Sequence, residues 1–103
     1  MAVYIRRAHK AEKLDIDLGV ERTKQIIAYN VVAVTVLDKG TGTFTLIWHF
    51  YDGTEFSLDN TEILNGDVFE WDIAELKLTN TAQPGQRLKL IVDIQLGPSP
   101  SRP

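Results

Sequence analysis

The chain has 103 residues, the length of one ordinary domain. Hydrophobic residues make up 44% of it and charged residues 24%, which is normal for a folded protein and argues against disorder. The absence of cysteine excludes a disulfide framework and a thiolate metal site.

Charge is distributed unevenly along the chain. Residues 1–13 hold four bases and one acid, whereas residues 14–103 hold seven bases and thirteen acids. We therefore predict a basic N-terminal arm over residues 1–13, attached to an acidic body. The opening residues lack the apolar run of a signal peptide, and no apolar stretch approaches the ~20 residues that a membrane span needs. We expect a protein that stays where it is made or leaves inside an assembled particle.

Alternation of apolar and polar residues predicts strands along most of the chain, because successive side chains of a strand point to opposite faces. The pattern covers residues 14–20, 43–51, 69–73 and 87–94. We interpret residues 21–29 as coil that leads into a strand. No segment convincingly predicts a helix.

Residues 26–37 differ, because both faces of this predicted strand are apolar. Such a strand is either central and covered on both sides, or bulged. The two predicted faces are Ile27, Tyr29, Val31 and Ala33 on one side and Ala28, Val32, Val34 and Val36 on the other.

Short turn signals separate the apolar runs. The segment Lys39-Gly40-Thr41-Gly42 divides two of them, Asp52-Gly53 and Asn65-Gly66 suit tight hairpins, and Pro84-Gly85 suits a type II turn. We expect this last turn to close a hairpin between residues 75–81 and 87–94. Strands joined directly by short turns predict an all-β fold, an antiparallel β-sandwich or barrel-like sandwich over residues 14–96. Residues 97–103 contain three prolines and predict a flexible, extended tail.

No residue pattern predicts catalysis, and we expect no enzyme activity, no catalytic residues and no cofactor. The histidines are His9, in the basic arm, and His49, within a strand. Ser57 lies between Phe56 and Leu58 and is best interpreted as an outward-facing strand serine. The overall pI of 5.2 argues against nucleic acid as a partner.

The segment from residue 52 to residue 75 is acidic and contains neither lysine nor arginine. The simplest interpretation is a solvated acidic face. Two alternatives remain open: an oxygen-rich calcium site such as Asp59-Asn60-Thr61-Glu62, although EF-hand spacing is missing, and a surface that receives the basic arm of a neighbouring copy. The acids are Asp52, Glu55, Asp59, Glu62, Asp67, Glu70, Asp72 and Glu75.

Two stretches carry a resemblance to a known class of proteins. Residues 78–90 read Leu-Thr-Asn-Thr-Ala-Gln-Pro-Gly-Gln-Arg-Leu-Lys-Leu, and residues 17–23 read Asp-Leu-Gly-Val-Glu-Arg-Thr. This pattern resembles small all-β virion structural proteins of tailed bacteriophages. Residues 43–46 and 65–68 fall where such proteins carry a strand and the turn before the next one. The chain departs from the pattern in its longer basic arm and its Pro/Ser tail.

The resemblance implies a non-enzymatic virion protein that is made in the host cytoplasm and localised in the particle. We expect a head decoration or cement protein that self-associates, as a trimer by analogy with capsid threefold positions, and docks on other virion proteins such as the major capsid protein. A head–tail connector or tail component is the alternative within the particle. A carbohydrate-binding β-sandwich is the alternative outside it, with Trp48, Trp71 or Tyr51 as a stacking platform.

We expect partner-binding residues in two places. The basic arm contributes charge and one aromatic side chain, and the strands contribute apolar side chains that alternation places on outward faces. The candidates are Tyr4, Arg6, Arg7 and Lys10 in the arm and Ile47, Tyr51 and Ile91 on the strands.

Overall fold

The computed structural model describes residues 9–96, and these residues form seven strands and no helix. The strands are β1 (His9–Asp17), β2 (Arg22–Asp38), β3 (Thr45–His49), β4 (Glu55–Asp59), β5 (Val68–Phe69), β6 (Ile73–Asn80) and β7 (Arg87–Gln95). Every strand pair is antiparallel, which confirms the predicted all-β class. Within residues 9–96 no helix is long and apolar enough to cross a membrane.

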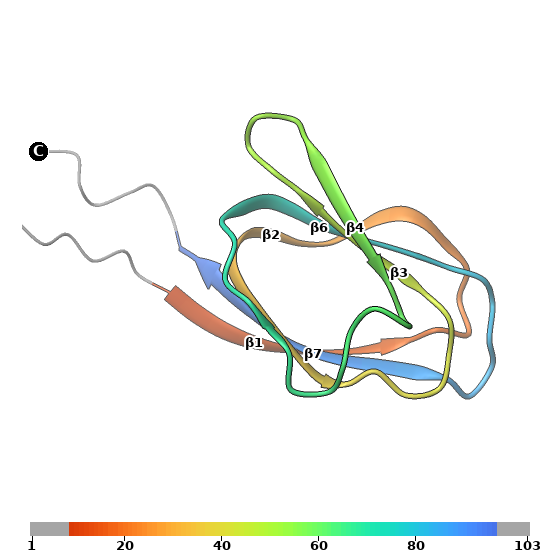
Figure 1. The fold of residues 1–103 in the computed structure, drawn as a ribbon. Helices are drawn as coiled ribbons and strands as arrows, with labels where there is room; N and C mark the ends of the chain where they lie inside the picture. The colour runs from red at the N-terminus through yellow and green to blue at the C-terminus, as the bar shows by residue number, and fades with distance from the viewer. Residues whose placement is uncertain (1–8, 97–103) are drawn as a thin grey trace, which may run out of the picture.

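The long strand β2 joins the two layers of a barrel-like sandwich (Figure 1). Its first half, residues 22–31, pairs with β6, and its second half, residues 31–38, pairs with β7. One layer therefore contains β4, β3, β6 and the first half of β2. The other contains the second half of β2, β7, β1 and the short β5.

Irregular backbone geometry lets β2 change layer. Its pairing register shifts between Ile26 and Ala28 and again between Val31 and Ala33. Asn30 lies between these shifts with a φ of 53°, a conformation that asparagine tolerates better than branched residues. Bulges bend a strand and increase its twist. The segment is bulged, as one of the two predicted alternatives states, and β2 also has a central place in the sheet between β7 and β6.

The bulges also overturn two details of the prediction. The strand begins at Arg22, so residues 22–29 are an irregular strand and not coil. The predicted faces do not persist along β2, because each bulge changes which side a residue faces. Val31 and Val34, predicted on opposite faces, are both fully buried, whereas Tyr29 is exposed.

The core lies between the two layers and follows the predicted alternation in β3 and β7. Leu46 and Trp48 of β3 are fully buried, as are Leu88, Leu90 and Val92 of β7. Burial of each large apolar side chain is worth about 1.5–3 kcal/mol, so this alternation is the main stabilising pattern of the fold. The other fully buried large side chains are Leu18, Val31, Val34, Val36, Ile63, Ile73, Leu76 and Leu78.

One end of the sandwich is closed by a turn network, which we define as residues 17–22, 40–43 and 80–87. Asn80, at 4% exposure, is its buried polar centre. The side-chain amide nitrogen of Asn80 donates to the carbonyl oxygens of Leu18 (3.1 Å), Val20 (2.9 Å) and Thr81 (2.7 Å). Its side-chain oxygen accepts a bond from Arg22 at 3.2 Å. These bonds satisfy carbonyl groups that no strand pairs.

The remaining turns pack onto this centre through glutamines and glycines. The side chain of Gln83 bonds both the main-chain nitrogen and the main-chain oxygen of Thr43, each at 2.7 Å. Gly40 has a φ of 63°, and a Cβ there would lie 2.8 Å from the carbonyl oxygen of Arg87. Only glycine fits this position, since it combines a positive φ with a close backbone approach.

The predicted turns form, but only one of them closes the hairpin expected of it. Asp52-Gly53 lies between β3 and β4, which pair directly. The turn at residues 83–86 has the expected bond from the Gln86 amide to the Gln83 carbonyl and a positive φ at Gly85. However, β2 lies between β6 and β7, so the predicted hairpin of residues 75–81 and 87–94 is wrong. Asn65-Gly66 likewise leads from β4 into β5 on the other layer.

The predicted boundary between the basic arm and the folded domain also differs from the observed one. Residues 9–13, predicted as the end of the arm, belong to β1 and pair with residues 91–95 of β7. The alternation of apolar and polar residues did not reveal this strand, because its side chains Lys10, Ala11 and Lys13 are exposed. Residues 1–8 of the arm and the predicted tail at 97–103 lie outside the described residues.

Replacing Asn80 with alanine is expected to destabilise the fold by about 2–3 kcal/mol, because it removes a buried side chain whose hydrogen bonds join the β1–β2 connection to the end of β6. The measurement is chemical denaturation followed by tryptophan fluorescence. The matched control is Gln25→Ala, which shortens an exposed amide side chain of β2 and should change stability by less than about 0.5 kcal/mol. Equal effects of the two variants would contradict the assigned role of Asn80.

Candidate interaction surface

The structure separates the apolar side chains that were predicted to form an outward surface. Ile47 of β3 lies on the outer face, as predicted, but it is only 5% exposed and therefore offers little apolar area to a partner. Ile91 of β7 is half-buried and lies on the opposite layer from Ile47. Tyr51 is 62% exposed and donates its hydroxyl to the Asn30 side chain at 3.0 Å. These three side chains therefore form no single patch.

The arm candidates are only partly described. Lys10 lies in β1, where its ammonium group is exposed and 3.6 Å from the Glu12 carboxylate. Tyr4, Arg6 and Arg7 lie outside the described residues.

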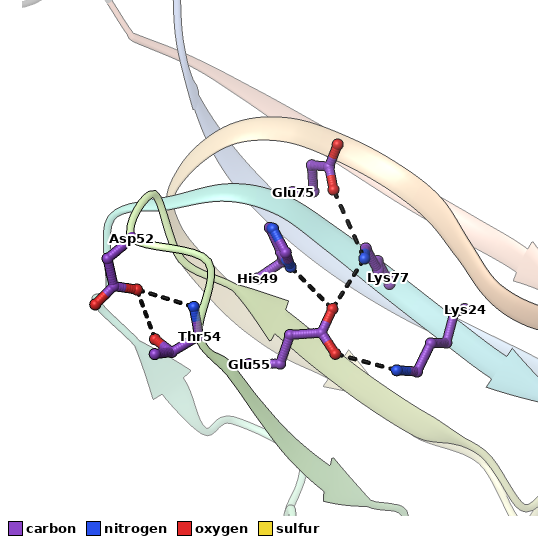
Figure 2. Close-up of polar contacts among 7 residues, drawn as sticks. All are labelled: Lys24, His49, Asp52, Thr54, Glu55, Glu75 and Lys77. Carbon is purple, nitrogen blue, oxygen red and sulfur yellow. Dashed lines mark hydrogen bonds and ion pairs between the residues drawn. The ribbon is translucent and has the colours of Figure 1, made fainter.

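A cluster of charged side chains covers the outer face of β3, β4 and β6 (Figure 2). Glu55 of β4 is its centre, and we call the group Lys24, His49, Glu55, Glu75 and Lys77 the Glu55 cluster. The Glu55 carboxylate lies 2.9 Å from Lys77 Nζ, 2.8 Å from His49 Nδ1 and 3.1 Å from Lys24 Nζ. Lys77 Nζ also lies 3.8 Å from Glu75. Four strands are thereby connected through side chains.

Strand register explains why these residues meet. His49 of β3 is directly opposite Glu55 of β4 and Glu75 of β6. Lys77 follows Glu75 by two residues on the same face of β6 and is opposite Ile47. Directly opposite and diagonal side chains on one face of a sheet lie within reach of each other. Lys24 reaches the cluster from β2, where a φ of 47° marks another irregular position.

The surrounding positive and hydrogen-bonding groups keep the Glu55 carboxylate ionised, which suits a structural role. Hydrogen bonds from Lys77, His49 and Lys24 lower the pKa of Glu55 to about 2. The hydrogen bond to Glu55 in turn raises the pKa of Lys77. A carboxylate stabilised as an anion by several partners is a poor proton donor, and its lone pairs are already engaged. We assign the cluster to holding β4 in place.

Several acids of the segment stabilise its own turns. Asp52 accepts bonds from the amide (3.0 Å) and the hydroxyl (2.7 Å) of Thr54, and these bonds lower the pKa of Asp52. Asp59 does the same with Thr61. Glu62 accepts a bond from the Asp59 amide at 3.0 Å. Between residues 9 and 96 no group of three or more histidine or acidic side chains is arranged to hold a metal ion.

Aromatic side chains gather beneath the opposite face of the β3–β4 hairpin. The ring of Trp71 is central, with centroids 5.4 Å from Trp48, 6.2 Å from Phe50, 5.3 Å from Phe56 and 5.4 Å from Phe69. Trp48 is fully buried and cannot serve as a stacking platform. Phe56 is 45% exposed, because among the strands of residues 9–96 only β3 pairs with β4.

The β3–β4 hairpin is therefore the candidate interaction surface. It combines a charged outer face whose groups are paired, an exposed aromatic side chain at Phe56 and an unpaired strand edge. Analysis of the sequence missed Phe56, although its alternation with Ser57 and Leu58 is visible there. What the alternation does not reveal is that β4 ends the sheet and leaves the Phe56 ring uncovered.

No protein-family model, curated protein or solved structure matched this chain.

The Glu55 cluster predicts a pH-dependent contribution to stability. Because folding lowers the pKa of Glu55 from 4.5 to about 2, its stabilising effect is complete above the unfolded pKa and is lost as the pH falls towards 2. The difference in unfolding free energy between the wild type and Glu55→Gln should be constant from pH 5.5 to 7 (roughly one unit or more above the unfolded pKa) and should shrink below that. Denaturant titrations across this range measure it.

The control for this prediction is Glu70→Gln, at an exposed position of the same acidic segment. Its difference from the wild type should vary less with pH than that of Glu55→Gln. A constant difference for Glu55→Gln down to pH 2.5 (within the window of the shift) would contradict the ion-paired role of Glu55.

Proposed function

We propose that this chain is a non-enzymatic structural protein of a tailed-phage particle, most specifically a head decoration or cement protein that assembles with its own copies. The single observation that carries the assembly role is the exposed Phe56 beside the unpaired edge of β4. An unpaired strand edge offers main-chain donors and acceptors to another chain, and an exposed aromatic side chain offers apolar area to bury.

The phage assignment rests on the sequence resemblance, and the turn network shows how the two resembling stretches lie in the fold. The two stretches that resemble phage virion proteins, residues 17–23 and 78–90, contact each other through Asn80 and Gln83. Residues 17–23 and 78–90 therefore act together to close one end of the sandwich. The resemblance then concerns residues that pack together in one part of the fold. A head–tail connector or tail component would use the same unit.

The charge distribution supports a second contact between copies. Residues 1–13 carry a net charge of +3, and residues 14–103 carry a net charge of −6. Glu70 and Asp72 are exposed acids on either side of Trp71 and are suitable contacts for a basic arm. Repetition of weak contacts on a symmetric particle makes the whole assembly stable.

A second candidate is a carbohydrate-binding module. The exposed ring of Tyr51 favours it, whereas full burial of Trp48 removes one of its predicted platforms. Quenching of the Trp71 fluorescence by members of an oligosaccharide panel would support this alternative. No change across the panel would leave assembly as the better proposal.

Reversing the charges of Arg6 and Arg7 to glutamate is expected to weaken self-association, by about tenfold or more at low salt and by less as salt screens the contacts. Multi-angle light scattering across a salt series measures the mass. The matched control is the double substitution Arg6→Lys and Arg7→Lys, which keeps the charge. An unchanged mass of the glutamate variant at every salt concentration would contradict a role for the arm.

A further inference from the structure

We propose that two copies of this chain pair through their β4 edges as antiparallel strands centred on Phe56. This inference rests on the proposed assembly function and names the contact that it uses. The partner is a second copy because the free edge of β4 is complementary to itself in one register.

The hydrogen-bonding pattern of the β3–β4 hairpin identifies the groups that are free. The amide of Phe50 bonds the carbonyl of Thr54, and the amide of Asn60 bonds the carbonyl of Phe44. Hydrogen-bonded pairs alternate along an antiparallel ladder, so Phe56 and Leu58 also direct their main-chain groups towards β3. Glu55, Ser57 and Asp59 therefore direct theirs to the open edge.

One end of this edge is already satisfied within the chain. The Asp59 amide donates to the Glu62 side chain at 3.0 Å, which removes one donor from the edge. Among the described residues nothing bonds the amides of Glu55 and Ser57. The free part of the edge is thus the short segment of residues 55–57, with Phe56 at its centre.

Only one self-pairing register uses these groups without opposing like charges. With Phe56 opposite Phe56 of the second copy, Glu55 faces Ser57 and each of these residues donates and accepts one main-chain bond. Centring on Ser57 would place Glu55 opposite Asp59 and would need the Asp59 amide that Glu62 occupies. Centring on Glu55 would place two carboxylates opposite each other.

The side chains fit this register on both faces. Phe56 occupies a non-hydrogen-bonded position, where opposing Cα atoms approach to about 4.5 Å, so the two exposed rings can pack together. On the outer face Asp59 of one copy lies opposite Gly53 of the other, and the position of a Cβ at Gly53 has no atom within 4 Å. The Glu55 carboxylate brings no unpaired charge to the contact, because it is bonded to its own Lys77, His49 and Lys24.

The test removes one edge amide. Ser57→Pro deletes a donor that points away from β3, and proline is tolerated at such positions of edge strands. We expect the dissociation constant of the pair to rise at least about tenfold, since both copies lose a bond across the contact. Analytical ultracentrifugation across a concentration series measures it, and thermal unfolding establishes that the variant is folded.

The matched control places the same substitution on the other end strand. The bond from the Leu18 amide to the Gln86 carbonyl sets the alternation of the β1–β7 ladder, and in this alternation Ala11 directs its amide away from β7. Ala11→Pro should therefore leave the dissociation constant unchanged.

Amide hydrogen exchange of the wild type provides a second measurement that needs no variant. Protection of the Glu55 and Ser57 amides should increase with protein concentration, while the Ala11 amide should exchange at a constant rate. A dimer mass with this protection supports the contact. An oligomer that persists unchanged in Ser57→Pro overturns the β4 contact and leaves the assembly function standing. A wild-type monomer at all concentrations overturns both the contact and self-association.

Discussion

The structure depends on the ability of one strand to serve two layers. If β2 were regular, its residues 22–38 would pair with one set of neighbours and the sheet would stay open. The bulges around Asn30 bend it, so that β6 pairs with its first half and β7 with its second half. The apolar sides of both layers then face each other across a single core. Along the path β1-β7-β2-β6-β3-β4 the end strands are β1 and β4.

One open end of this sandwich is closed by turns, and hydrogen bonds from polar side chains hold these turns together. The Asn80 amide group satisfies carbonyls of the β1–β2 connection from the far end of β6. Buried polar groups stabilise a fold only when all of their partners are present. The stretches around Asp17 and Asn80 are thus held together by side-chain hydrogen bonds at this end of the sandwich.

The sequence was sufficient to predict the fold class, the core of the regular strands and the turn positions, because alternation and glycine-containing pairs act locally. It was insufficient to predict which strands are neighbours. Pro84-Gly85 forms its turn, yet β6 and β7 are separated by β2, since turn chemistry sets the local geometry and long-range pairing sets the order. The exposure of Phe56 and the burial of Ile47 depend on that order, as does the Glu55 cluster, whose members come from residues 24–77.

The two end strands of the sheet are protected to different degrees, and this difference favours β4 as the contact. On β1 the carbonyl of Asp17 accepts a bond from Arg22 at 2.8 Å, and the carbonyl of Asp15 accepts one from Arg87 at 3.4 Å. Exposed lysines follow along the same strand, and charged side chains on an edge discourage pairing with other chains. On β4 the acids are neutralised or bonded within the chain, and the exposed side chain at the middle of the strand is aromatic. The β4 edge is thus left open next to an apolar ring, whereas the β1 edge carries charged side chains and two carbonyls that are already bonded, so the proposed contact between copies fits β4 better than β1.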